Sequence, residues 1–184
     1  MTREAVIVST ARTPIGKAYR GAFNDTDAPV LGGHAIASAV SRAGIEPGEI
    51  QDVVMGCAMQ QGSSGANIGR TAGVAAGLPS SVAGMSMDRQ CASGMMAIAT
   101  AAKQVIVDNM PIVVGGGIES ISLVQNEHRN AYRATSPAVI SRSEHAYMSM
   151  LDTAEVVAKR YNVSRDAQDE YAFQSQQRTA AAQQ

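Results

Sequence analysis

The residues with the clearest chemical potential lie in the segment MDRQCASGM, Met87 to Met95, which has Cys91 at its centre. An apolar run that ends at Met87 predicts a β-strand, and a helical pattern extends from about Cys91 to Asp108. A cysteine at such a strand–turn–helix junction can act as a nucleophile, because the N–H groups and positive dipole end of the helix stabilise a thiolate. The small residues Ala92, Ser93 and Gly94 would leave the sulfur accessible to a substrate.

Acyl transfer is the chemistry that this arrangement favours. The same N–H groups could hold the negative oxygen of a thioester carbonyl under attack, and a nucleophile on such an elbow is typical of acyl-transfer enzymes. The alternative is that Cys91 is a small buried hydrophobe, as free cysteines often are, and its position alone leaves both interpretations open. For Cys57, which follows the run DVVMG, the buried role is the favoured interpretation.

Four apolar runs predict the strands that would position these residues: Glu4–Thr10, Asp52–Met55, Val82–Met87 and Ile112–Gly115. The first is rich in β-branched residues and predicts a strand buried on both faces. Three helical patterns lie between the runs, at Leu31–Ala43, Asn67–Ala76 and Cys91–Asp108. This alternation predicts an α/β fold with parallel strand pairing and helices on both faces of the sheet. Cys91 would then lie at the carboxyl edge, where open α/β sheets bind ligands.

The character of the sequence changes after Ser122. Val124 to Tyr147 is polar and without periodicity, and its length predicts a functional loop or the start of an inserted subdomain. Two helices are expected next, over Thr153–Tyr161 and from Ser164 to the end, with Ser164 as the N-cap of the second. Because this last helix has no C-cap and no returning strand, we expect the 184 residues to be part of a longer protein.

Composition excludes several classes of function. Hydrophobic residues make up 45% of the chain, aromatic residues only 4%, and the net charge is -1, so no basic field for nucleic acid is present. The sequence has no apolar run of the roughly 20 residues that span a bilayer, and it starts almost directly with a strand-like segment, so neither a membrane nor a signal peptide is expected. Two cysteines 34 positions apart predict neither a disulfide framework nor a zinc site. A reducing compartment, the cytoplasm, is the expected location.

Several linked motifs resemble the thiolase family, in order and over essentially the whole chain. They are VSTARTPIGK, the Gln60 to Arg70 loop, MDRQCASGM, GGGIESIS and the final TAEVVAKRYNVSRDAQDEYAFQSQQR. The resemblance implies a thiolase-like layered fold, in which a mixed sheet has helices on both faces. It implies an amino-terminal α/β domain over residues 1–122 that carries the nucleophile. Residues 123–184 would be the start of a loop domain covering the substrate, with its following helices, and the carboxyl-terminal thiolase domain would be absent.

The resemblance also implies a reaction. Cys91 would accept an acyl group from an acyl-coenzyme A or 3-ketoacyl-coenzyme A, and acetyl-coenzyme A would then condense with it or coenzyme A would cleave it. These thioesters are substrates, and no permanently bound cofactor is implied. Thiolases use an Asn, a His and a second Cys from the second half of the chain, and this sequence ends before their motifs; His34, His128 and His145 do not replace them. The family also implies a homodimer or homotetramer, with the loop from Gly56 to Arg70 reaching across the subunit interface.

Some positions depart from the family pattern. Asp88 stands where Asn, Ser or Thr is usual, and Ser149 to Asp152 replaces the family's His-Met-Gly. Met150 is the best match to the methionine of the family's acyl and pantetheine pocket, although simple packing at a helix start is an equal alternative. Glu119 is expected to be a hydrogen-bonded turn carboxylate rather than a general base. Arg12 and Arg70 are expected to be structural or interface residues.

Three hypotheses therefore follow from the sequence. The first is a thiolase of which this chain is an incomplete part, unable to turn over alone. The second is a non-catalytic subunit or scaffold that keeps the thiolase half-fold and needs a partner chain. The third keeps the elbow but changes the reaction, as in ketoacyl or hydroxymethylglutaryl synthases, and the RTPIGK and SRDAQDEYA segments argue against it.

Overall fold

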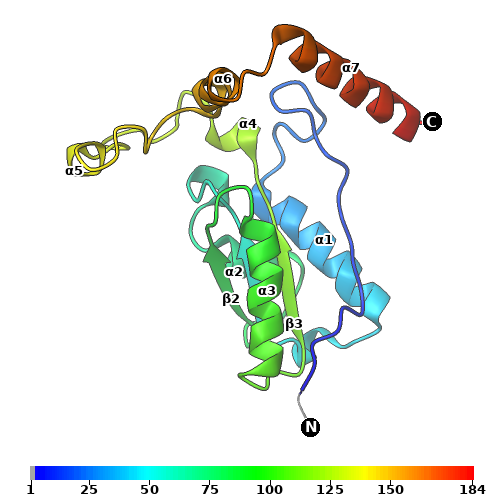
Figure 1. The fold of residues 1–184 in the computed structure, drawn as a ribbon. Coiled ribbons are helices and arrows are strands. Elements are labelled where there is room, and N and C mark those ends of the chain that lie inside the picture. Colours follow the sequence, from blue (N-terminus) through cyan, green and yellow to red (C-terminus); the bar gives the residue numbers. More distant parts are fainter. Residues whose placement is uncertain (1–2) are drawn as a thin grey trace. The chain divides into compact units, whose positions relative to one another are not determined.

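The computed structural model describes residues 3–184. The chain forms two compact units, Met1–Asn130 and Ala131–Gln184, and each is described by itself. The first unit contains the regular elements α1 (Ala28–Ala43), η1 (Pro47–Glu49), β1 (Asp52–Gly56), η2 (Gly62–Ser64), α2 (Ile68–Ala75), β2 (Ala83–Met87), α3 (Ser93–Ile106), β3 (Val113–Gly117) and α4 (Ile121–Val124) (Figure 1). The predicted α/β alternation is therefore confirmed from residue 28 onward.

The three strands form one sheet in the order β2-β1-β3. Both pairings are parallel, with Val54 of β1 opposite Met85 of β2 and Gly115 of β3. Because parallel strands point the same way, all three end at one edge of the sheet, and the turn that contains Cys91 follows β2 at that edge.

Alternate residues of β1 face opposite layers of helices. Val53 and Met55 belong to a buried cluster with residues of α1 and α2. Val54, which stands between these two residues in the sequence, is also fully buried, but it packs with Ala97 and Ala101 of α3. The central strand is therefore covered on both faces, which explains why its sequence is apolar without alternation.

The prediction of a buried strand over Glu4–Thr10 is wrong for this structure. The segment has no regular structure, and Val6, Ile7 and Val8 are 74%, 76% and 73% exposed. Polar contacts lie at both ends of the segment: Arg3, just before it, donates to the backbone oxygen of Met110, and Arg42 donates to the backbone oxygen of Thr10. β-branched residues favour extended backbone, but a strand also needs a neighbour to pair with, and this run pairs with none among the described residues.

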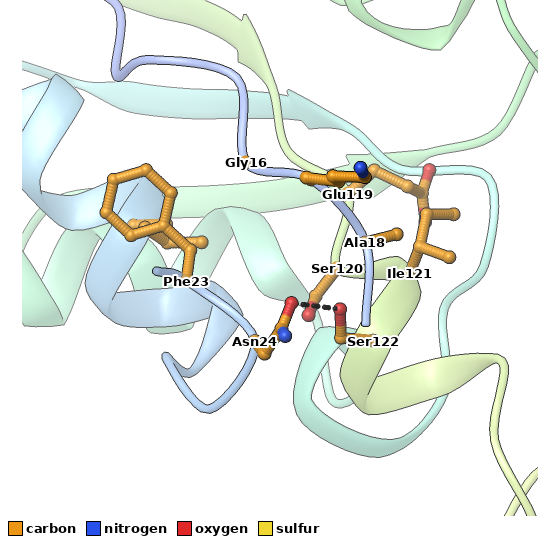
Figure 2. Close-up of a pocket in the computed structure, with 10 residues that line it drawn as sticks. Gly16, Ala18, Phe23, Asn24, Glu119, Ser120, Ile121 and Ser122 are labelled. Atoms are coloured by element: carbon orange, nitrogen blue, oxygen red, sulfur yellow. Dashed lines mark hydrogen bonds between the residues drawn. The ribbon is translucent and has the colours of Figure 1, made fainter. Parts of the chain in front are cut away.

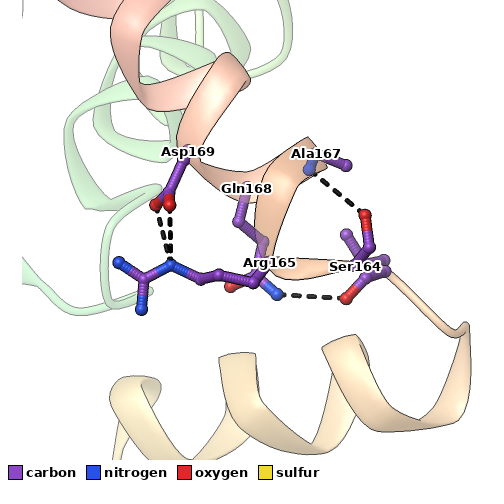
Figure 3. Close-up of polar contacts among 6 residues, drawn as sticks. Ser164, Arg165, Ala167, Gln168 and Asp169 are labelled. Atoms are coloured by element: carbon purple, nitrogen blue, oxygen red, sulfur yellow. Dashed lines mark hydrogen bonds and ion pairs between the residues drawn. The ribbon is translucent and has the colours of Figure 1, made fainter.

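The second unit contains three helices: α5 (Pro137–Ile140), α6 (Met150–Arg160) and α7 (Arg165–Ala182). Ser164 caps α7 as predicted, since its hydroxyl accepts a hydrogen bond from the N–H of Ala167 (Figure 3). Arg165 adds an ion pair of 2.8 Å to Asp169 one turn later. Side-chain capping and this i,i+4 pair stabilise the start of a helix whose residues are all exposed.

Candidate functional site: a cysteine turn at the carboxyl edge of the sheet

Cys91 lies in the turn between β2 and α3, at the carboxyl edge of the sheet, as the sequence predicted. Its thiol is free and the residue is exposed. The helix itself begins two residues later than expected, at Ser93, with Ala92 in the N-cap position. Cys91 therefore immediately precedes the N-cap, next to the positive end of a 14-residue helix.

The turn is held by side chains that flank the cysteine. Ser93 accepts a hydrogen bond of 2.9 Å from the N–H of Arg89, and its hydroxyl donates to the carbonyl of Gln90. Asp88 accepts a hydrogen bond of 2.6 Å from the N–H of Gln90. Gln90 itself has φ 48°, a left-handed conformation that few non-glycine residues adopt. These side-chain bonds enforce the sharp bend that places the Cys91 sulfur at the surface.

Two N–H groups near the start of α3 are already occupied within this turn. Ala92 donates to the carbonyl of Arg89, and Ser93 donates to that of Gln90. The sequence expectation that the first N–H groups are free for a substrate oxygen is therefore wrong for these two residues. The turn-closing role of Ser93 was missed, and its only sequence signal was a serine two positions after the cysteine.

Cys57 differs from Cys91 in its exposure to solvent: Cys57 is buried and Cys91 is exposed. Cys57 follows β1 and is only 1% exposed, so the predicted buried role is confirmed. Burial raises the pKa of the Cys57 thiol to about 11, and the nearby Glu119 carboxylate adds to the rise. Cys57 therefore remains a protonated thiol at neutral pH, which is unsuited to nucleophilic attack.

Glu119 follows β3 and accepts hydrogen bonds from the loop after β1. Its carboxylate accepts from the N–H of Ala58 at 2.9 Å and from that of Met59 at 3.1 Å. The prediction of a hydrogen-bonded turn carboxylate is thus confirmed. Glu119 also lines a cavity of about 90 Å³ together with residues of the Gly16–Asn24 loop and the start of α4. Figure 2 shows these lining residues and the hydrogen bond, 3.0 Å long, that joins Asn24 and Ser122.

The remaining candidate residues belong to other segments of the chain than the Cys91 turn. Met150 is the first residue of α6 in the second unit and is 78% exposed. His34 lies within α1, as predicted, and His128 and His145 are exposed. Arg70 donates to the backbone oxygens of Val82 and Ser80, which gives it the structural role expected of it.

Residues 3–184 contain no group of three or more His, Cys, Asp or Glu side chains that could hold a metal ion. None of the helices described there combines the length and apolar character needed to cross a membrane.

Curated relatives match this chain over nearly its whole length. A 3-ketoacyl-CoA thiolase of Bacillus subtilis is 40% identical over 182 residues, which cover 98% of this chain and 46% of the relative. An acetyl-CoA acetyltransferase of Cupriavidus necator is 36% identical over 190 residues, with 98% and 48% covered. The chain thus spans about half the length of the curated relatives it matches.

The fold and the family model agree with these relatives. The crystal structure of the Bacillus anthracis acetyl-CoA acetyltransferase superposes with a TM-score of 0.76 at 34% identity, covering 94% of this chain and 45% of that one. The family model for the thiolase N-terminal domain matches residues 5–184, which include the cysteine turn. The chain therefore belongs to the thiolase family and matches its amino-terminal domain.

Proposed function

We propose that this chain supplies the nucleophile of a thiolase, which transfers acyl groups between coenzyme A thioesters. The observation that supports this most strongly is the exposed Cys91 in a side-chain-braced turn directly before α3. The relatives named as thiolases and acetyl-CoA acetyltransferases match the segment that contains this turn. A fold hosts many reactions, so the assignment depends on this site rather than on the fold.

In the proposed first step, the Cys91 thiolate attacks the carbonyl carbon of an acyl-coenzyme A. The new bond joins Sγ to this carbon, the bond to the coenzyme A sulfur breaks, and the coenzyme A thiolate leaves and takes up a proton. The turn exposes the attacking sulfur, and the positive end of α3 favours the negative charge on the thiolate and on the carbonyl oxygen.

In the synthetic direction, acetyl-coenzyme A loses a proton from its methyl carbon, this carbon bonds to the acyl carbonyl carbon, and the bond to Sγ breaks so that Cys91 leaves as a thiolate. In the degradative direction, Sγ instead attacks the 3-keto carbon of a 3-ketoacyl-coenzyme A, and the C2–C3 bond breaks. Acetyl-coenzyme A then leaves after it takes up a proton, and the thiolate of a second coenzyme A takes the acyl group from Sγ.

The substrates proposed are acyl-coenzyme A and acetyl-coenzyme A, with no permanently bound cofactor. Met150, exposed at the start of α6, is proposed to contact the acyl or pantetheine part of the substrate. The protein is proposed to act in the cytoplasm as a homodimer or homotetramer. Residues 1–122 are proposed to be the nucleophile-bearing domain and residues 123–184 the start of the substrate-covering region.

The 184-residue chain alone is proposed to accept an acyl group but not to turn over. Catalytic turnover in the family needs the Asn, His and second Cys of motifs that this sequence does not contain. A single acyl transfer needs only a thiolate and a thioester, so it remains testable in this chain.

The test is incubation of the folded chain with acetyl-coenzyme A, followed by mass spectrometry of its peptides. An acetyl group on the peptide that contains Cys91, removed by hydroxylamine as a thioester is, supports the proposal. Cys91→Ala should lose this adduct, whereas the matched variant Cys57→Ala should keep it. Absence of the adduct, or its appearance on Cys57 instead, would refute the assignment of Cys91 as the acyl acceptor.

A further inference from the structure

The carboxylate of Glu119 contacts three consecutive residues of the loop that follows β1. It accepts hydrogen bonds from the N–H groups of Ala58 and Met59, and the Cys57 thiol donates to it at 3.6 Å. Backbone N–H groups that converge on one carboxylate stabilise its charged form and fix the backbone that presents them. Glu119 therefore determines the course of the chain immediately after β1.

A second contact joins the end of β1 to the end of β3. We call residues 56–59 the β1 exit and residues 118–119 the β3 exit. The N–H of Ile118, the residue before Glu119, donates to the carbonyl of Gly56 at 3.0 Å. Ile118 therefore bonds to Gly56 through the backbone, and the next residue, Glu119, bonds to Ala58 and Met59 through its carboxylate. The two exits therefore form one braced unit.

The other side of the β1 exit contacts the cysteine turn. The N–H of Cys57 donates to the carbonyl of Met87 at 2.9 Å, and Met87 is the last residue of β2. The backbone of Gly56 lies so close to Ser93 that a Cβ on Gly56 would fall 2.1 Å from the Ser93 carbonyl carbon. The β1 exit thus touches both ends of the turn that contains Cys91, and Glu119 holds that exit in place from the opposite side.

We propose that Glu119 is a positioning residue for the nucleophile: its carboxylate fixes the β1 exit, which in turn holds the Cys91 turn. This inference rests on the proposed function of Cys91 in acyl transfer. Glu119 itself touches neither Cys91 nor, in the proposed step, the reacting atoms. Its effect is expected in the reactivity of the cysteine within the folded state.

The test measures site-resolved alkylation by iodoacetamide in the full 184-residue chain, with Cys91 and Cys57 quantified separately by mass spectrometry. In Glu119→Gln, one of the two acceptor oxygens becomes a donor that faces an N–H group, so the negative charge and one of the two backbone hydrogen bonds are lost with little change in size. Glu127→Gln is the matched control, since its carboxylate is 86% exposed and has only a 3.8 Å contact to His128. Circular dichroism and urea titration define conditions under which every variant is folded.

We expect alkylation of Cys91 to fall at least fivefold in folded Glu119→Gln and to stay within twofold of the parent in Glu127→Gln. Cys57 should become more reactive, because a neighbouring negative charge is removed. A merely structural role would lower the urea midpoint and leave the folded-state rate of Cys91 unchanged, and that result would overturn the proposal.

A second variant covers the case in which Glu119→Gln does not fold. Glu119→Asp keeps the charge but is one methylene too short to reach both N–H groups, so a fall in Cys91 alkylation is again expected, and an unchanged rate refutes the inference. Iodoacetamide requires no acyl chemistry, so this result is independent of acetyl-coenzyme A labelling. Loss of acetyl labelling in the parent chain refutes the proposed function, whereas an unaltered alkylation rate in the variants refutes only the role of Glu119.

Discussion

The Ser93 hydroxyl accepts a hydrogen bond of 2.9 Å from the backbone N–H of Arg89, four residues earlier, and so closes the turn around Cys91. The same hydroxyl donates to the carbonyl of Gln90, the residue that has the left-handed backbone. Ser93 is only 5% exposed, so water cannot easily replace these bonds. Ser93 therefore fixes the backbone of the two residues that precede Cys91.

Replacement of Ser93 by alanine should lower both stability and cysteine reactivity. The N–H of Arg89 loses its acceptor, which we expect to decrease the free energy of unfolding by about 1–2 kcal/mol in urea titrations. The turn should also relax from the strained conformation at Gln90, so alkylation of Cys91 should slow several-fold. Ser81→Ala, at an exposed serine just before β2, is the control and should change neither quantity. Equal Cys91 rates in the two variants would show that the Ser93 bonds do not shape the site.

Replacement of Gly56 by alanine should prevent normal packing of β1 on α3. The new Cβ would lie 2.1 Å from the carbonyl carbon of Ser93 and 2.5 Å from the nitrogen of Gly94, both backbone atoms. We expect a loss of about 3 kcal/mol or more in the free energy of unfolding, because backbone cannot move aside as a flexible side chain can. Gly48→Ala is the matched control, since its nearest contact would be 4.0 Å away, on Pro79. Similar unfolding midpoints for the two variants would contradict the close contact.

The Cys57 thiol should make stability depend on pH in the alkaline range. Its pKa is about 11 in the folded chain against an ordinary value of 9.0, so the unfolded chain releases this proton first as the pH rises. The contribution of the protonated Cys57 thiol to the free energy of unfolding is fully present below pH 9 and is lost as the pH rises through about 11. This contribution is roughly 3 kcal/mol at most. Measured by urea titration, the stability difference between the parent and Cys57→Ala should shrink over this window. A difference that stays constant from pH 8 to 11 would refute the raised pKa.

Much of the site could be predicted because its determinants are local. The apolar run to Met87 and the helical pattern after Cys91 are sufficient to define the strand–turn–helix junction, and the Ser164 cap depends only on neighbouring residues. Helix α1 begins at Ala28, earlier than expected, because Pro29 is compatible with a first helical turn.

The predictions fail where the local structure depends on residues far away in the sequence or on an unusual backbone conformation. The strand predicted over Glu4–Thr10 needs a neighbouring strand that the local sequence cannot specify. The bonds of Ser93 depend on the backbone angles of Gln90, which no local propensity predicts for a glutamine. The contact of Glu119 with Ala58 joins residues 61 positions apart, so only the folded sheet brings them together.

The two cysteines should differ sharply in reactivity towards iodoacetamide. Cys91 is exposed beside a helix N-terminus, whereas Cys57 is 1% exposed and protonated at neutral pH. We expect Cys91 to be modified at least tenfold faster in the folded chain at pH 7.5, as measured by mass spectrometry of both peptides. In urea the two rates should converge. Faster labelling of Cys57 in the folded chain would overturn the choice of Cys91 as nucleophile.

The most direct measurement of the central claim is protection of Cys91 by acetyl-coenzyme A. The folded chain is incubated with acetyl-coenzyme A or with free coenzyme A, and iodoacetamide labelling of both cysteines is then compared. If Cys91 accepts the acetyl group, acetyl-coenzyme A lowers its labelling, hydroxylamine restores it, and Cys57 labelling is the same in both samples. Labelling of Cys91 that is identical after acetyl-coenzyme A and after coenzyme A would contradict the assignment of Cys91 as the acyl-accepting nucleophile.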